Sequence, residues 1–135
     1  MKGEAILTQG SAFYWRKTVG HIYASVKLYH GRRSLEVRAL VDTGATTLIL
    51  PKDLAEKLGM QVLGEMEVEL ADGTFRRVGY GALEVEINDR RAPAFAAIVE
   101  RGEVCIGVEV LERLGLAVDP ATGKIYPTRR FVTRL

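Results

Sequence analysis

One acidic residue lies in a sequence setting that is suited to a catalytic carboxylate. Asp42 ends an apolar run and is followed by Thr43 and Gly44, and a second apolar run begins at Thr47. A carboxylate at the end of a buried strand is costly unless hydrogen bonds hold it. Thr43 offers a hydroxyl, and Gly44 lets the backbone turn sharply and present its N–H to an anion. Asp and Gly are both common in turns, so Asp-Thr-Gly alone says little, but apolar runs on both sides favour a carboxylate held in a fixed cradle.

Other residue types suited to catalysis or metal binding are scarce. Cys105 is the single cysteine, which excludes an intramolecular disulfide and a cysteine-rich zinc site. The two histidines, His21 and His30, leave little for a histidine-based metal site. The sequence therefore predicts a protein without a bound metal or cofactor.

The charge balance gives no sign of wholesale electrostatic binding. The 135 residues include 19 Lys and Arg against 17 Asp and Glu, a net charge of +2, so we expect no nucleic-acid partner. No apolar run approaches the roughly 20 residues of a membrane span, and MKGEAILTQGSAFYWRK at the start has no sustained apolar core of a signal peptide. We therefore expect a cytoplasmic protein with no membrane partner.

The elements that must position Asp42 follow from alternation and turn residues. Apolar and polar residues alternate over much of the chain, as in strands with one buried face. A glycine follows each of two short helical patterns, and Pro51 stands where a first helical residue would. The sequence predicts strands over 19–29, 34–41, 47–50, 65–70, 75–87, 94–99, 104–107, 116–118 and 124–126, and helices over 52–58 and 108–114. The expected fold class is all-β with one or two short helices.

Two further patterns bear on the architecture. Gly79 and Gly81 lie inside a predicted strand and indicate a bend, a bulge or the close approach of another backbone. The segments 55–60 and 111–116, AEKLGM and LERLGL, resemble each other, and each lies beyond a short apolar strand. Either two short helices with glycine ends look alike by chance, or the domain contains two similar half-units.

Three features together resemble one protein family. The segment LVDTGA at 40–45 resembles the active-site loop of the retropepsin-like aspartic proteases. The family has a hairpin, the flap, after its first helix, and the segment 66–85 stands in that place. It also has an apolar pair and a glycine before a second helix, as in Cys105-Ile106-Gly107 followed by 108–115. The resemblance covers roughly 19–126.

The resemblance implies a fold and a set of site residues. The fold would be a closed acid-protease-like β-barrel, a single domain over 1–135 with an N-terminal extension (1–18), a core (about 19–126) and a basic tail (127–135). Asp42 would be catalytic, Thr43 would hydrogen-bond across a dimer, and the Gly44 N–H would steady the carboxylate. Ala45 would complete the supporting loop. The flap tip would comprise Ala71, Asp72, Gly73 and Thr74, where Asp-Gly is itself a strong hairpin signal.

The mechanism of this family needs two aspartates, but the chain has one Asp-Thr-Gly. None of the other aspartates is followed by Thr or Ser and then Gly. Two chains must therefore meet, each giving one Asp42, which predicts a homodimer with a twofold axis. The resulting pair would share one proton, activate a water and hydrolyse a peptide or protein substrate.

Two other functions stay open. A non-catalytic retropepsin-like module could serve dimerisation or peptide binding, and a structural β-barrel without a groove is a weaker third possibility. The intact Asp42-Thr43-Gly44 favours the enzyme. At the ends, the aromatic run 13–15 could pack on the core, cover a dimer edge or occupy the groove. Arg129, Arg130 and Arg134 are interpreted as a solubilising terminus, because three charges offer few phosphate contacts.

Overall fold

The computed structural model describes residues 21–132. The predictions for the extension 1–18, for the aromatic run 13–15 and for Arg134 fall outside these residues. Within them no helix is long and apolar enough to cross a membrane.

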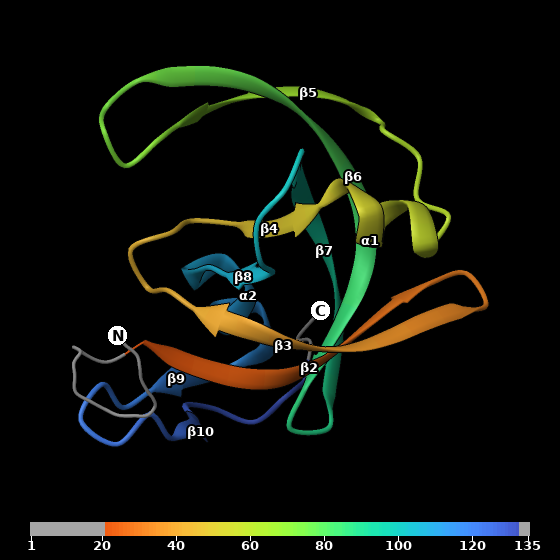
Figure 1. Cartoon of the computed structure of the whole chain (residues 1–135). Coiled ribbons are helices and arrows are strands. Elements are labelled where there is room, and N and C mark those ends of the chain that lie inside the picture. The colour runs from red at the N-terminus through yellow and green to blue at the C-terminus, as the bar shows by residue number, and fades with distance from the viewer. Residues whose placement is uncertain (1–20, 133–135) are drawn as a thin grey trace.

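The elements follow the predicted order (Figure 1). The strands are β2 (Ile22–His30), β3 (Arg33–Val41), β4 (Leu48–Pro51), β5 (Gly64–Glu69), β6 (Phe75–Ile87), β7 (Arg90–Val99), β8 (Cys105–Ile106), β9 (Leu116–Val118) and β10 (Ile125–Pro127); the helices are α1 (Lys52–Lys57) and α2 (Val108–Leu114).

Two local predictions were wrong in detail. Pro51 ends β4 in an extended conformation, with φ −63° and ψ 146°, and precedes α1 instead of being its first helical residue. Strand β7 begins at Arg90, earlier than the predicted 94, because Asn88 and Asp89 both adopt positive φ and form a two-residue turn. Such a turn matches the twist of the strands that it joins, so pairing continues to its edge.

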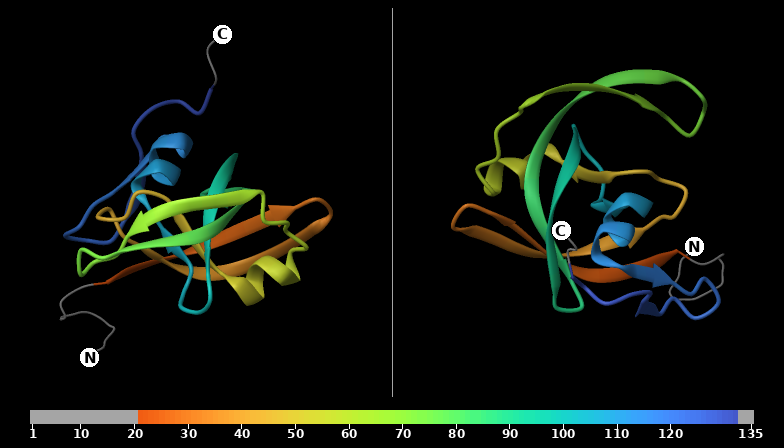
Figure 2. Two further views of the ribbon diagram at one scale, coloured as in Figure 1. Left: turned by 90° about the horizontal axis from the view of Figure 1, so that it is seen from above. Right: turned by 180° about the vertical axis from the view of Figure 1, so that it is seen from behind.

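The main sheet closes on itself. Its strands lie in the order β2-β3-β8-β4-β7-β6-β5, and β2 also pairs with β6. The pairings from β2 round to β6 and back therefore form a complete circuit, which agrees with the all-β barrel that the sequence predicted. Strand β5 extends β6 outside this circuit as a long hairpin, which arches away from the rest of the sheet in Figure 1 and in the view from behind in Figure 2.

The order of the strands is that of two half-units. Hairpin β2–β3 leads to β4 and α1, and hairpin β6–β7 leads to β8 and α2. Each short strand joins the hairpin of the other half in parallel, β4 beside β7 and β8 beside β3. Ile49 and Cys105 pair where the halves meet. The likeness of the two helical segments thus reflects related half-units.

The core fills the barrel with alternate side chains of the strands. Helix α2 adds Val110, Leu111 and Leu114 to it. At Gly81 the connection from α1 passes so close that a Cβ would lie 2.9 Å from the Gln61 carbonyl oxygen. Of the readings left open for this glycine, close approach of another backbone is the correct one. The largest fully buried side chains are Leu28, Leu48, Leu50, Leu58, Ile87, Ile106, Leu114, Val26 and Val85.

Candidate active site

Asp42 lies at the start of the connection between β3 and β4, called here the Asp42 loop (residues 42–47). The Gly44 N–H donates to Asp42 Oδ1 at 2.9 Å, as expected from the sequence. The Ala45 N–H donates to the Asp42 carbonyl at 3.0 Å, which tightens the turn. Asp42, Thr43 and Gly44 are exposed in the single chain. The loop therefore holds one carboxylate in a defined place while leaving it open to another molecule.

Backbone hydrogen bonds tie this loop to β8 and to the start of α2. The Asp42 N–H donates to the Ile106 carbonyl at 3.0 Å, so the loop continues the pairing of β3 with β8. The N–H groups of Val108 and Glu109 donate to the carbonyls of Ala45 and Thr46, each at 2.9 Å. The first N–H groups of a helix have no partner within it. Here the loop satisfies two of them, which ties its backbone to the helix.

Gly107, between β8 and α2, packs directly against the Asp42 loop. A Cβ at this position would lie 2.5 Å from the Thr47 carbonyl oxygen and 2.6 Å from the Thr46 carbonyl carbon. Its φ of −91° is open to any residue. Glycine is therefore required because the two backbones lie so close together, and not because of its own backbone conformation.

An apolar strip runs beside Asp42 on the outer face of the sheet. Cross-strand partners project from the same face, and the register links Leu40 to Cys105, Cys105 to Ile49, Ile49 to Ala97 and Ala97 to Tyr80. The chain neighbours of the first four residues pack in or against the core, so their side chains lie on the other face of the sheet. Tyr80 stands between two glycines and shares this face because it pairs with Ala97. We call these five side chains the outer strip. It crosses strands of both half-units and ends next to the carboxylate.

The hairpin of β5 and β6 continues the outer strip. Met66 and Val78 are partners and lie on the same face as Tyr80. The opposite face carries exposed charges, including Glu65 and Arg77, whose side chains form an ion pair at 3.2 Å. Phe95 adds a ring that is 60% exposed, in edge contact with Tyr80 at a centroid distance of 5.9 Å. A surface of this kind suits an extended chain with apolar side chains.

Cys105 behaves as a small apolar residue within the strip, as the sequence indicated. The side chain is buried, with 7% exposed. Burial, and then the negative charges of Asp42 and Glu103, raise the pKa of the Cys105 thiol to about 11. The thiol is therefore neutral at physiological pH.

The raised pKa of Cys105 gives a measurable expectation. At pH 8, iodoacetamide should modify the native thiol at least roughly a hundredfold more slowly than the urea-unfolded thiol, because an unperturbed cysteine has a pKa of about 8.5. Since the pKa is raised in the folded state, its contribution to stability is complete below the ordinary value and is lost as the pH rises toward 11. Mass spectrometry of timed samples measures both rates. Equal rates would contradict the buried placement.

The tip of the hairpin lies where the sequence placed it, at Ala71-Asp72-Gly73-Thr74, and it is tightly bonded. Asp72 Oδ1 accepts the Thr74 N–H at 3.0 Å and the Thr74 hydroxyl at 2.6 Å. The Leu70 N–H donates to the Thr74 carbonyl at 2.7 Å. Gly73 has a φ of +86°, which favours glycine. The tip is thus a defined turn.

The Asp72 bonds set a pH dependence at this tip. The Thr74 hydroxyl, followed by the Thr74 N–H, holds the pKa of Asp72 below its ordinary value. The ionised carboxylate therefore stabilises the turn above the ordinary pKa, and this contribution is lost as the pH falls through the lowered value. Replacing Thr74 with valine should raise the pKa of Asp72 in an NMR titration, whereas Thr74→Ser should leave it low. If the pKa of Asp72 stays low in both variants, the hydrogen bond from the Thr74 hydroxyl is not its cause.

A cavity of about 420 Å³ adjoins the Asp42 loop at Thr43. It connects the exposed Thr43 with α2 and the C-terminal hairpin β9–β10. Its lining consists of Thr43, Val108, Leu111, Glu112, Leu116, Ala117, Val118, Thr128 and Arg129. Among the described residues no group of three or more His, Cys, Asp or Glu side chains could hold a metal ion.

Several of these residues were missed by the sequence analysis. Ile49, Ala97 and Tyr80 join the site through the register, which a single sequence does not reveal. Alternation could have placed each on the outer face of its strand, but not beside Asp42. Arg129 was assigned to a solubilising tail, whereas its side chain is hydrogen-bonded to the end of α2.

Comparison with known proteins identifies the family and the fold. Residues 33–113, more than half of the chain, match the family model described as "gag-polyprotein putative aspartyl protease". The EIAV protease complexed with the inhibitor HBY-793 is similar in structure, with a TM-score of 0.61 at 15% identity over 71% of this chain and 89% of that chain. The solution structure of the simian foamy virus (mac) protease gives 0.49 at 15% identity, over 68% and 93%. No curated protein matches the chain.

Proposed function

Because the chain belongs to the gag-polyprotein aspartyl protease family, we propose that it is an aspartic endopeptidase whose active pair is formed by the Asp42 residues of two copies. The observation that carries this proposal is the Asp42 loop itself. Its carboxylate accepts the Gly44 N–H, its backbone is tied to α2, and it is exposed in the single chain. Exposure leaves the carboxylate open to a second copy and to a peptide, and the adjoining outer strip offers that peptide an apolar surface.

The two half-units explain why a second copy is needed. In the first half the Asp42 loop follows the end of β3; in the second half, residues 100–103 follow the end of β7 at the corresponding place. That segment reads Glu-Arg-Gly-Glu and has no Asp-Thr-Gly. One chain thus supplies half of an aspartic pair, and a twofold axis beside Asp42 supplies the other half.

The chemistry follows from placing two carboxylates close together. They cannot both ionise easily, so they share one proton and titrate as a unit. The protonated carboxyl donates to the carbonyl oxygen of the scissile peptide, and the ionised one accepts a proton from water. The resulting hydroxide adds to the carbonyl carbon. The intermediate then collapses as the C–N bond breaks: the carboxyl that took the proton of water gives it to the nitrogen, and a hydroxyl of the intermediate returns a proton to the other carboxylate. No covalent bond to the enzyme forms.

The substrate would be an extended peptide lying along the outer strip. Backbone pairing gives such a chain its affinity, and alternate side chains enter pockets. The hairpin of β5 and β6 would cover it and exclude water, in the manner of a flap. Thr43 would brace the two loops across the twofold axis.

The surface facing the second copy would include the cavity beside Thr43. Its walls are mostly apolar, and the two-stranded sheet β9–β10 that borders it pairs with no other strand among the described residues. A hairpin of two strands is marginal alone in water. Burial against a second copy would stabilise it and would bring the two Thr43 residues together.

The proposal predicts that cleavage depends on the concentration of the chain. A defined peptide mixture is incubated with enzyme over a range of concentrations and pH, and products are identified by mass spectrometry. Activity per chain should rise with concentration and level off where sedimentation shows that dimers are complete. Peptide binding by a dimer without cleavage at any pH would favour the alternative, a non-catalytic binding module.

A further inference from the structure

The segment after β10 folds back onto the end of α2. The Thr128 N–H donates to the Gly115 carbonyl at 2.8 Å. The next residue, Arg129, donates through Nη2 to the carbonyls of Glu112 and Arg113 at 2.9 and 3.1 Å. Its Nη1 donates to the Arg130 carbonyl at 3.2 Å. Both terminal nitrogens of the Arg129 guanidinium are therefore hydrogen-bonded to backbone carbonyls.

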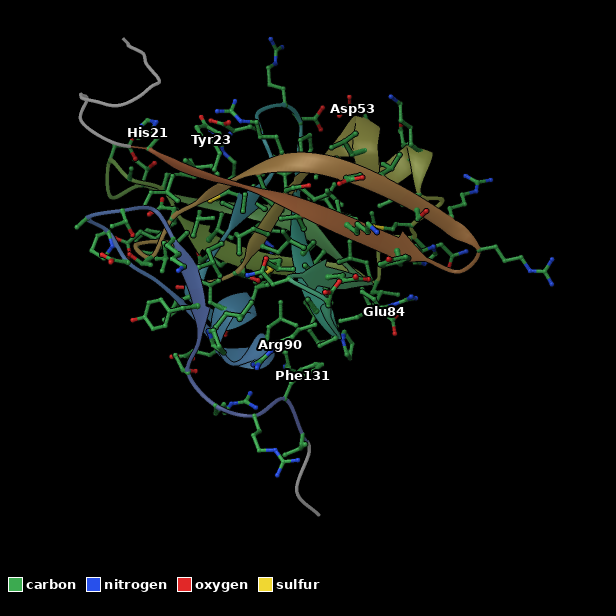
Figure 3. All side chains as sticks on the ribbon, turned by 90° about the horizontal axis from the view of Figure 1, so that it is seen from below. His21, Tyr23, Asp53, Glu84, Arg90 and Phe131 are labelled. Carbon is green, nitrogen blue, oxygen red and sulfur yellow. The ribbon has the colours of Figure 1, made fainter. Side chains whose placement is uncertain are left out.

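A second arginine reaches the same helix end from the other side. Arg90, the first residue of β7, donates through Nη1 to the carbonyls of Leu114 and Gly115 at 2.9 and 3.1 Å. The Phe131 ring lies over the Arg90 guanidinium, with 5.6 Å between Cζ and the ring centroid. Figure 3 shows these two side chains together below α2. The segment after β10 thus also packs against Arg90.

The two arginines complete the end of the helix. The last carbonyls of a helix lack partners within it and carry partial negative charge. Here the carbonyls from 112 to 115 each accept a bond from Arg90 or Arg129. Gly115 has a φ of +67°, and a Cβ there would lie 2.9 Å from Arg90 Nη1 and 3.0 Å from Arg129 Cγ. Glycine suits this left-handed conformation, and a larger residue would require both arginine side chains to shift.

The opposite end of α2 holds the Asp42 loop through the Val108 and Glu109 N–H groups. The helix has seven residues, so its two ends are about two turns apart. Arg129 and Thr43 also line the same cavity. The helix therefore connects the arginines directly to the loop.

We propose that Arg129 is a positioning residue for the Asp42 loop: together with Arg90 it fixes the C-terminal end of α2, and through the helix it sets where Asp42 stands. The consequence for cleavage rests on the function proposed above. The segment after β10 is then a brace of the active site and not a solubilising tail. Arg129 acts through α2 and touches no substrate.

The test compares two neighbouring arginines. Arg129→Ala removes the bonds to the helix. Arg130→Ala removes the same charge but keeps the Arg130 carbonyl, the only atom of that residue that bonds to Arg129. Amide hydrogen exchange by NMR at Val108 and Glu109 reports the far end of the helix. We expect exchange at these two amides to become about tenfold faster in Arg129→Ala, since bonds to a charged donor are lost, and to be unchanged in Arg130→Ala. Arg129→Lys should restore part of the protection.

Cleavage supplies the second measurement. With the dimer complete, kcat of Arg129→Ala should fall about tenfold with little change in KM, because small displacements of catalytic groups can cost up to about a hundredfold. Equal exchange in the two alanine variants, or faster exchange confined to Gly115 and Thr128, would overturn the brace. Faster exchange at Val108 and Glu109 with an unchanged kcat would overturn its role in positioning. If the unaltered protein cleaves no peptide, the proposed function fails, while the exchange result still decides the brace.

Discussion

Replacing Asp42 with asparagine should lower peptide cleavage by at least about a thousandfold, as expected when a group that takes part in bond making is removed. Asparagine has nearly the same shape, and its amide oxygen can still accept the Gly44 N–H that now reaches Asp42 Oδ1 at 2.9 Å. It cannot take a proton from water or return one to the leaving nitrogen. The chemistry should therefore be lost while the loop is retained. Cleavage rates, melting temperature and sedimentation together measure this.

Asp53 provides the matched control for Asp42. It is an exposed acid in the first turn of α1, labelled in Figure 3. Asp53→Asn changes the net charge by the same amount as Asp42→Asn, so cleavage by this variant should be unchanged. Cleavage that survives in Asp42→Asn would show that another group carries the chemistry.

The second large effect is expected at Gly107. An added Cβ would stand 2.5 Å from the Thr47 carbonyl oxygen and 2.7 Å from the Thr47 nitrogen, which are backbone atoms that cannot rotate away. Gly107→Ala should therefore lower the free energy of unfolding by about 3 kcal/mol, the upper part of the range for overpacking. Cleavage should fall as well, because the atoms that must move belong to the Asp42 loop. Urea unfolding measures the change in stability.

Gly31→Ala is the control that separates the effect of packing from the effect of backbone conformation. Gly31 lies in the turn between β2 and β3 with a φ of +59°, and a Cβ there would meet nothing within 4 Å. Gly31→Ala should cost about 1–2 kcal/mol from the left-handed conformation alone, and it should leave cleavage intact. A Gly107→Ala protein as stable and as active as this control would show that the loop and α2 are not packed as closely as described.

Much of the local structure could be predicted, because it depends on residues near one another in the sequence. Alternation defined β6 over 75–87, and the pattern that ends before Gly115 defined α2 over 108–114. The start of β7 was predicted too late because the apolar run begins only at 94, whereas pairing with β6 already begins at Arg90, directly after the turn at Asn88 and Asp89. Pro51 suited both the end of a strand and the start of a helix, and the pairing of β4 with β7 decided between them.

The candidate site was predictable only in part, for a related reason. The residues 42–45 and the hairpin tip are continuous segments with distinctive residue types. The outer strip is assembled by pairing between distant strands, so that Leu40 meets Cys105 and Ala97 meets Tyr80. Arg129 looked like part of a charged tail because nothing local shows that the carbonyls at the end of α2 lie within reach of it and Arg90.

A mixing experiment tests most directly whether two chains share one active pair. Unaltered protein and an equal amount of the Asp42→Asn protein are exchanged to equilibrium, and native mass spectrometry verifies that mixed dimers form. Random pairing leaves about a quarter of the dimers with both Asp42 residues, so the activity should fall to about half of that of the unaltered protein alone. If the mixture keeps the full activity of the unaltered protein that it contains, although mixed dimers are present, a single Asp42 suffices. That result would contradict the shared pair.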